Sequence, residues 1–285
     1  MRIVAATDFS TRSQRAVRRA GLLARASDAD LILLHVVDDD QPERIVDVES
    51  REARKYQNEL IDSMTELRGV RCEPVVVAGD AFDGILRVAR TRAADLIVMG
   101  AHRRQMLRDI FVGTSVERVI RTGPFPVLMV NTEVSRHYER VLAAVDLSEP
   151  SAHAIRTAKA LKLTGGSTLT LVHAFDPFAE GKMSLAGVGQ DDIDTYVMNE
   201  QLRAGQDTVA FLEANGLGGE AWSLRVRKGQ ALDVISDAVQ ELSPDLLVMG
   251  THGRSGISKF FLGSVTEDVL RSVVVDILAV PPKPA

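Results

Sequence analysis

The sequence predicts an α/β protein made of two tandem Rossmann-like domains, each with a five-stranded parallel sheet and helices on both faces. Three observations support this prediction: short apolar runs alternate with helical patterns, the pattern occurs twice, and each half has about 130–150 residues, enough for one hydrophobic core. We expect the domains at residues 1–133 and 138–285, joined by a polar segment between two apolar runs.

The two halves repeat each other at landmarks along the chain. Asp8 matches Asp146 at an offset of 138, and Gly100 matches Gly250 at an offset of 150. The second half therefore carries 12 extra residues (150 minus 138), which we place in the Gly-rich stretch 177–192. A period this long indicates a duplicated domain, because the units of solenoid repeats are much shorter.

Each half contains five short apolar runs typical of strands that are buried on both faces of a parallel sheet. The runs of the first half are 3–7, 31–37, 75–78, 95–99 and 127–130, and those of the second are 141–145, 168–175, 223–226, 245–249 and 277–280. Helical patterns start near Ser10 and Ser148 and occupy 49–67, 82–92, 115–121, 194–213, 232–241 and 265–271. The alternation predicts a doubly wound sheet with right-handed crossovers.

Composition and charge limit the classes of function. With 45% hydrophobic and 26% charged residues, the chain has the composition of a globular protein. Lys+Arg minus Asp+Glu gives +1 for residues 1–137 (21 minus 20) and −6 for 138–285 (13 minus 19), so neither half predicts nucleic-acid binding. No apolar run is long enough to span a bilayer. Because Cys72 is the only cysteine and no leader pattern precedes the first strand, we expect a cytoplasmic protein.

A glycine-rich loop follows the fourth strand of each half. In the second half, Gly250 and Gly253 are followed by nine residues and then by Gly263 and Ser264. Glycine lets backbone N–H groups approach a polyphosphate, and the N-terminus of the next helix adds donors and a partial positive charge. The loop therefore predicts a phosphate site, and a structural turn is the alternative. In such sheets ligands lie beyond the carboxyl ends of the strands, where Asp146 is also expected.

The loop of the first half departs from this pattern at one position. Gly100, Gly113 and Thr114 keep the spacing, but Arg103 replaces the second glycine. A side chain there would intrude where the backbone must approach phosphate, so we expect no nucleotide in the first half. As an alternative, Arg103 and Arg104 could bind an anion directly through their guanidinium groups.

The chain resembles the universal stress proteins over its whole length, twice. The resemblance is carried by the G-x2-G-x9-G-S loop after the fourth strand and by Asp146 after the first strand of the second half. It implies the strand order 3-2-1-4-5. It also implies that ATP binds at the carboxyl edge of the sheet, in the crevice where the strand order reverses. By this resemblance Ala144, Val145 and Asp146 face the adenosine, Ala174 borders the adenine, Met249, Gly250, His252 and Gly253 line the ribose and phosphates, and Gly263, Ser264 and Val265 close over the phosphate tail.

The function expected from the resemblance is a stress-response regulator that binds ATP in the second domain, with a degenerate first domain as its structural partner. Mg²⁺ could accompany the nucleotide. No loop carries the lysine that braces a γ-phosphate in G-x4-G-K-[ST], so at most a slow ATPase is expected. The alternative is a nucleotide-independent scaffold or small-ligand carrier, in which residues 177–192 cover a different pocket.

Two further expectations concern metals and assembly. Within each half, two histidines and the aspartate after the first strand could meet as three ligands, but they lack close metal spacing, and we expect no metal site. The residues are His35, His102 and Asp8, and His173, His252 and Asp146. The last strand of each half is apolar and should be covered, so we expect the halves to pair as an intramolecular pseudo-dimer. Association of whole chains into a homodimer is a further possibility.

Overall fold

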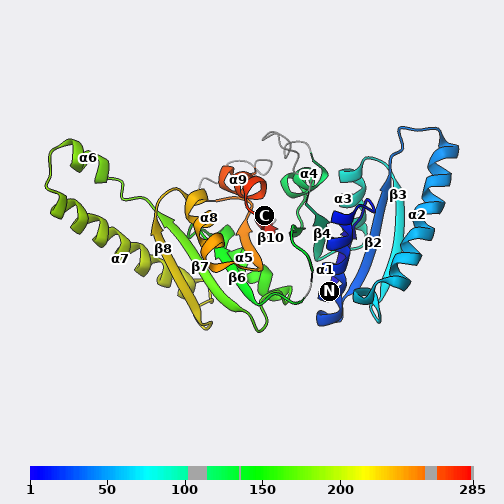
Figure 1. Cartoon of the computed structure of the whole chain (residues 1–285), viewed down its shortest axis with the longest axis horizontal. Helices are drawn as coiled ribbons and strands as arrows, with labels where there is room; N and C mark the ends of the chain where they lie inside the picture. The colour runs from blue at the N-terminus through cyan, green and yellow to red at the C-terminus, as the bar shows by residue number, and fades with distance from the viewer. Residues whose placement is uncertain (102–113, 135, 254–261, 284–285) are drawn as a thin grey trace.

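A ten-stranded sheet forms the centre of the molecule, with helices on both faces (Figure 1). The computed structural model describes residues 1–101, 114–134, 136–253 and 262–283. The strands are β1 (Arg2–Ala6), β2 (Asp30–Val37), β3 (Cys72–Ala78), β4 (Leu96–Gly100), β5 (Val127–Val130), β6 (Arg140–Ala144), β7 (Thr168–Phe175), β8 (Trp222–Lys228), β9 (Leu246–Gly250) and β10 (Asp276–Val280). All ten predicted strands are therefore present.

The helices follow the predicted alternation, with two differences. They are α1 (Thr11–Ser27), α2 (Glu43–Ser63), the 3₁₀ helix η1 (Thr65–Leu67), α3 (Ala81–Thr91), α4 (Ser115–Thr122), α5 (Glu149–Ala160), α6 (Glu180–Leu185), α7 (Gln190–Ala214), α8 (Ala231–Leu242) and α9 (Ser264–Ser272). Helix α2 begins directly after Pro42, earlier than predicted, because proline is compatible with a helix start. The extra segment of the second half contains a short helix, α6, that its Gly-rich sequence did not predict.

The order of the strands is β3-β2-β1-β4-β5-β10-β9-β6-β7-β8. Each half thus has the expected 3-2-1-4-5 order, with parallel neighbours. The expectation of a five-stranded sheet in each domain was wrong, because β5 and β10 pair antiparallel and join the strands into one ten-stranded sheet. The expected pairing of the last strands of the two halves is confirmed. Leu128 lies opposite Leu278 in this pair, and each strand would otherwise leave an apolar edge and its backbone groups unpaired.

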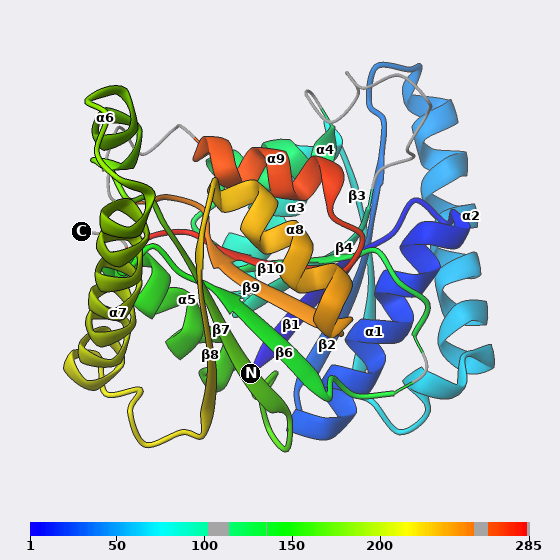
Figure 2. The ribbon, with the colours of Figure 1, turned by 60° about the vertical axis from the view of Figure 1, so that its left-hand side comes forward.

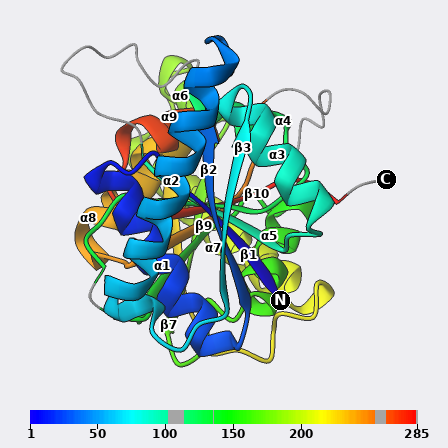
Figure 3. The same ribbon diagram turned by 90° about the vertical axis from the view of Figure 1, so that its right-hand side faces the viewer.

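Two layers of helices cover the sheet, and each layer crosses from one domain to the other. Figure 3 shows α1 and α2 on one side of the first-domain strands and α3 and α4 on the other, and Figure 2 shows α8 and α9 in front of the second-domain strands. Met129 and Ile277 pack in a core shared by α3, α4, α8 and α9. Leu128 and Leu278 pack in the opposite core with α1 and α5. The domains therefore share their hydrophobic cores.

A buried polar cluster fixes the junction between the domains on the α1 side. The fully buried carboxylate of Asp276 accepts hydrogen bonds from the backbone N–H of Asn131 (2.9 Å) and Thr132 (3.0 Å) and from the hydroxyl of Tyr138 (2.9 Å). The Nε atom of Arg19 lies 3.3 Å from the same carboxylate. Burial, together with the negative charge of Asp276, raises the pKa of Tyr138 well above its usual value. The segment between the domains is thus held by a neutral phenol and a buried ion pair.

Candidate functional site

The turn after β6 presents Asp146 at the carboxyl edge of the sheet. Leu147 adopts a left-handed conformation (φ 61°), which turns the chain sharply from the strand into α5. The Oδ1 atom of Asp146 accepts hydrogen bonds from the hydroxyls of Ser148 and Ser151, both at 2.5 Å. Ser148 also caps α5 by accepting from the backbone N–H of Ser151. These bonds fix the rotamer of Asp146, so that its other oxygen, Oδ2, faces the glycine loop, as described below.

Histidines brace the tips of the neighbouring strands in both domains. The Nδ1 atom of His173 on β7 lies 2.9 Å from the carbonyl oxygen of Val145, and that of His35 lies 2.8 Å from the carbonyl oxygen of Thr7. Since a carbonyl only accepts, each ring donates from Nδ1. In the described ranges, no group of three or more His, Cys, Asp or Glu residues is arranged to hold a metal ion. His102, part of the metal alternative, lies outside the described residues.

The glycine loop is tied to β10 at its base and passes close to Asp146. The N–H of Thr251 donates to Val280 O (2.9 Å), and that of Gly263 donates to Thr251 O (2.9 Å), which closes the loop. A Cβ atom at Gly253 would lie 2.6 Å from Oδ2 of Asp146. That oxygen cannot swing away without breaking the serine hydrogen bonds on Oδ1. A side chain at position 253 would therefore displace Asp146 or shift the loop, and glycine avoids this clash.

The N-terminus of α9 forms the other wall of the site. Ser264 is the first residue of this helix, and the helix has no side-chain cap because Gly263 occupies the N-cap position. The hydroxyl of Thr266 donates to Gly250 O (3.0 Å) and so ties the first turn of α9 to the end of β9. The unpaired N–H groups of this turn suit an anion, and the Ser264 hydroxyl adds a donor.

These elements enclose a cavity of about 370 Å³. All eleven site residues expected from the sequence line it: Ala144, Val145, Asp146, Ala174, Met249, Gly250, His252, Gly253, Gly263, Ser264 and Val265. Ser151, Val172, Ala231, Ile235 and Thr266 also line it, and sequence reasoning did not name them. Val172 could have been found, because it lies two residues before Ala174 and so faces the same side of β7. None of the described lining residues is Lys or Arg.

His252 presents a polar group in this cavity. Its Nδ1 atom lies 2.9 Å from the hydroxyl of Thr251. Its Nε2 atom is buried and has no hydrogen-bond partner in the described part of the chain. A buried polar atom without a partner costs free energy, on the order of 1–3 kcal/mol. A ligand group that pairs with Nε2 would remove this cost.

The first domain has a corresponding cleft that is about half as large, at about 190 Å³. Its lining repeats that of the second domain, with Thr7, Asp8, Val36, Ile85 and Met99 at the positions of Val145, Asp146, Ala174, Ile235 and Met249. Partial burial opposes ionisation of Asp8, but hydrogen bonds from Ser10 and Ser13 hold its pKa below the usual value. Arg103 and Arg104 fall outside the described residues.

One difference between the clefts is an exchange of side-chain bulk. Val36 on β2 faces Gly84 on α3, where an added Cβ atom would lie 2.9 Å from both methyl groups of Val36. The corresponding residues of the second domain are Ala174 on β7 and Val234 on α8. The larger side chain is thus on the strand in the first domain and on the helix in the second. Because the strand residue lines the cleft, this exchange leaves more room in the second domain.

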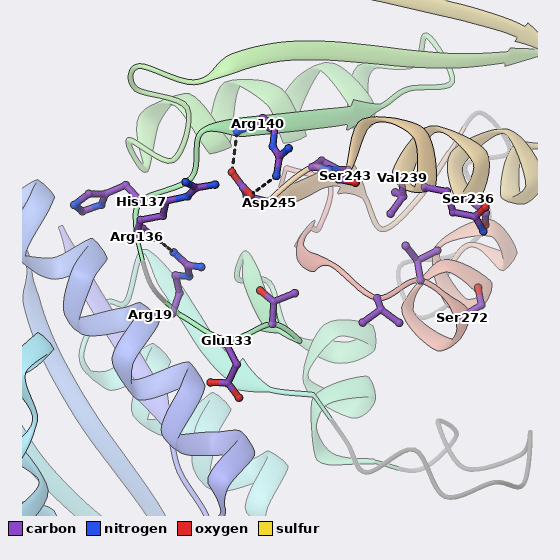
Figure 4. Close-up of a pocket in the computed structure, with 15 residues that line it drawn as sticks. Arg19, Glu133, Arg136, His137, Arg140, Ser236, Val239, Ser243, Asp245 and Ser272 are labelled. Atoms are coloured by element: carbon purple, nitrogen blue, oxygen red, sulfur yellow. Dashed lines mark hydrogen bonds and ion pairs between the residues drawn. The ribbon is translucent and has the colours of Figure 1, made fainter.

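A third cavity, of about 570 Å³, lies at the domain junction (Figure 4). Its exposed arginines already have partners: Arg140 pairs with Asp245 (3.3 Å) and Arg136 with Glu139 (3.3 Å). Arg140 begins β6 and Asp245 precedes β9, so this cavity lies at the amino edge of these strands. Ligands of doubly wound sheets bind at the opposite edge, and we therefore take the 370 Å³ cavity as the candidate site.

The extra segment of the second domain stands apart from this site. None of residues 177–192 lines the candidate cavity. Phe178 and Leu185 are 78% and 92% exposed, and Figure 1 places α6 at the tip of the molecule, beyond β8. The placement of residues 177–192 therefore does not support the expectation that this segment covers a pocket.

Comparison with known proteins identifies the family. The model of the universal stress protein family matches residues 1–131 and again 137–281. Universal stress protein E of Escherichia coli K12 is 27% identical over 207 residues, which are 70% of this chain. The match spans 65% of that relative, just under two thirds of its length. The chain belongs to the universal stress protein family, whose members are stress-response proteins, and contains two copies of its domain.

Solved structures agree with the fold. A universal stress protein from Archaeoglobus fulgidus superposes with a TM-score of 0.71 at 19% identity, covering 98% of each chain. A universal stress protein solved in complex with cAMP is 29% identical and matches 47% of this chain and 98% of its own, with a TM-score of 0.40.

In the described part of the chain, no helix combines the length and the apolar character needed to cross a membrane.

Proposed function

We propose that this chain is a stress-response regulatory protein that binds ATP in the cleft of its second domain. The observation that supports this most is the meeting of Asp146, Gly253 and the N-terminus of α9 around one cavity of about 370 Å³. The first domain, with its smaller cleft and Arg103 in the loop, acts as a structural partner. One ATP per chain is the expected stoichiometry.

The cavity offers a separate environment for each part of the nucleotide. Ala174, Val172 and Ile235 form an apolar wall for the adenine. Oδ2 of Asp146, which faces Gly253 at the edge of the cavity, accepts a hydrogen bond from a ribose hydroxyl. A carboxylate beside the phosphates would repel them, which supports this assignment to the ribose.

The phosphates would lie between the glycine loop and α9. In the described part of the site, the groups suited to phosphate are backbone N–H groups, the Ser264 hydroxyl and the dipole of α9. Mg²⁺ could neutralise part of the phosphate charge. Because the sequence has no G-x4-G-K-[ST] motif, we expect the site to hold ATP and not to hydrolyse it rapidly.

Thermal unfolding with and without ATP tests the proposal on a matched pair of variants. ATP at about a hundred times its dissociation constant should stabilise the wild-type protein by roughly 2.7 kcal/mol. Asp146→Asn should lose most of this ATP-dependent stabilisation, because the charged carboxylate that accepts a hydrogen bond from the ribose is replaced by a neutral amide. Asp8→Asn, the same change in the first domain, should keep it. Equal loss in both variants, or no shift in the wild-type protein, would reject ATP binding in the second domain.

A further inference from the structure

Two acidic residues and two arginines face each other where α4 of the first domain meets α9 of the second. Glu117 pairs with Arg121 on α4, and Glu267 pairs with Arg271 (2.5 Å) on α9, both at i,i+4 spacing. The two pairs are related by the offset of 150 that separates the glycine loops. Figure 1 shows α4 and α9 near the centre of the molecule.

An ion pair between α4 and α9 links the two domains at this point. An Nη atom of Arg121 lies 3.8 Å from Oε2 of Glu267. The carboxylate of Glu267 is therefore held by an arginine of its own helix and by an arginine of the other domain. Its side chain is 26% exposed and that of Arg121 is 33% exposed, so solvent screens this pair only in part.

Glu267 lies in the first turn of the helix that borders the candidate cavity. Its backbone N–H donates to Gly263 O (2.9 Å), and Ser264, Val265 and Thr266 directly before it line the cavity. A negative charge in this turn is favourable for a helix with nothing bound, but it repels an anion placed at the same helix end. A polyphosphate bound there requires Glu267 to be neutralised by its neighbours.

We propose that Arg121 is a positioning residue which the first domain contributes to the nucleotide site of the second. This role rests on the ATP site proposed above. Arg121 holds the carboxylate of Glu267 at the domain junction and offsets its charge, so that polyphosphate binds at the N-terminus of α9. A first domain that binds no nucleotide would thereby still set the affinity of its partner.

Isothermal titration of the full chain with ATP and with adenosine tests this role. Arg121→Gln should weaken ATP binding about three- to tenfold and leave adenosine binding unchanged, because only the phosphates lie close to Glu267. Arg121→Lys should retain most of the affinity for ATP. Arg118→Gln is the matched control, since Arg118 lies on the same helix but pairs with Asp80 of the first domain (3.0 Å).

A second substitution separates charge compensation from packing. In Arg121→Gln/Glu267→Gln, the charge that requires compensation is gone, and ATP affinity should return to that of Glu267→Gln alone. An equal loss for ATP and adenosine, or no recovery in the double variant, would show that Arg121 acts by packing and would overturn the proposal. Wild-type ATP affinity in Arg121→Gln would also overturn it. Failure of the wild-type protein itself to bind ATP would reject the proposed function and this role together.

Discussion

The clefts of the two domains have the same framework but differ where a nucleotide would bind. In both, a left-handed residue after the first strand (Phe9 at φ 62°, Leu147 at φ 61°) turns the chain into a capped helix. In both, a histidine on the second strand braces the tip of the first. Since the first domain keeps this framework around a cleft of half the volume, the framework serves the fold whether or not a ligand binds.

Three of the differences between the clefts bear directly on nucleotide binding. The first domain has Arg103, Val36 and Thr114 where the second has Gly253, Ala174 and Ser264. Thr114 caps α4 by accepting from the N–H of Glu117 (3.2 Å), whereas α9 has no side-chain cap and begins with Ser264. In the proposed function, these three positions decide which of the two domains binds phosphate.

The largest expected effect comes from copying the first-domain loop residue into the second domain. Gly253→Arg places a Cβ atom where Oδ2 of Asp146 lies 2.6 Å away and blocks the approach of backbone to phosphate. Loss of two or three N–H bonds to a charged group, at about 1.5–3 kcal/mol each, should weaken ATP binding by at least roughly two orders of magnitude. Titration calorimetry measures the loss, and circular dichroism checks the fold.

Gly219→Arg is the control for that experiment, because nothing lies within 4 Å of a Cβ atom at this glycine. It should bind ATP normally. The reverse change, Arg103→Gly, is not expected to create a site by itself, because Val36 still narrows the first cleft. Normal ATP affinity in folded Gly253→Arg would mean that the loop does not hold the phosphates.

An intermediate effect on ATP affinity is expected from the position at which the first domain has Val36 on the strand and the second has Ala174. Ala174→Val should reduce ATP affinity about tenfold and destabilise the fold by about 1–3 kcal/mol, since the valine meets a full-sized Val234. Adding Val234→Gly reproduces the first-domain pair and should relieve part of the strain without restoring affinity. Urea unfolding and ATP titration separate these effects. Unchanged affinity in Ala174→Val would place the adenine elsewhere.

Removing the hydroxyl at the start of α9 should affect ATP binding, whereas removing the hydroxyl at the start of α4 should affect the stability of the fold. Ser264→Ala should weaken ATP binding roughly tenfold with little change in stability, because the hydroxyl does not cap α9. Thr114→Ala should destabilise the protein by about 1 kcal/mol through loss of the α4 cap and leave ATP binding intact. The same response in both variants would contradict the division of roles between the domains.

The smallest expected effect concerns Asp8, whose pKa is lowered in the folded state. A lowered pKa means that ionised Asp8 stabilises the fold above the pKa of the unfolded chain, about 3.9. Asp8→Asn should therefore be slightly less stable than the wild-type protein at pH 7. The difference should shrink as the pH falls below about 4, which urea unfolding at several pH values can follow. A difference that does not depend on pH would mean that the carboxylate charge contributes nothing.

The sequence predicted most of the framework because its signals are local. The ten strands and their duplicated alternation with helices followed from the apolar runs. The strand order and the eleven expected cavity-lining residues were implied by the resemblance to the universal stress proteins, which rests on Asp146 and on the spacing of the glycines. Edge strand β3 was predicted too short, because Pro74 ends an apolar run in sequence but is tolerated on an edge strand whose outer side is unpaired. The start of α2 was missed for a similar reason, since Pro42 looks like a helix breaker.

Features that depend on tertiary packing were not accessible. The buried carboxylate of Asp276 and the contact of Gly253 with Asp146 arise between segments distant in sequence. Ser151 and Thr266 were missed because each lies within a helix and reaches the site only by hydrogen bonding back to a strand end. The exchange between Val36 and Ala174 became meaningful only when Gly84 and Val234 were seen on the facing helices.

The central claim is that two similar clefts in one chain differ in their capacity to bind ATP. Isothermal titration of the wild-type full-length chain with ATP measures this directly as a stoichiometry. The account predicts one site per chain, which disappears in Gly253→Arg. A stoichiometry near two, or a single site that survives in Gly253→Arg, would contradict it.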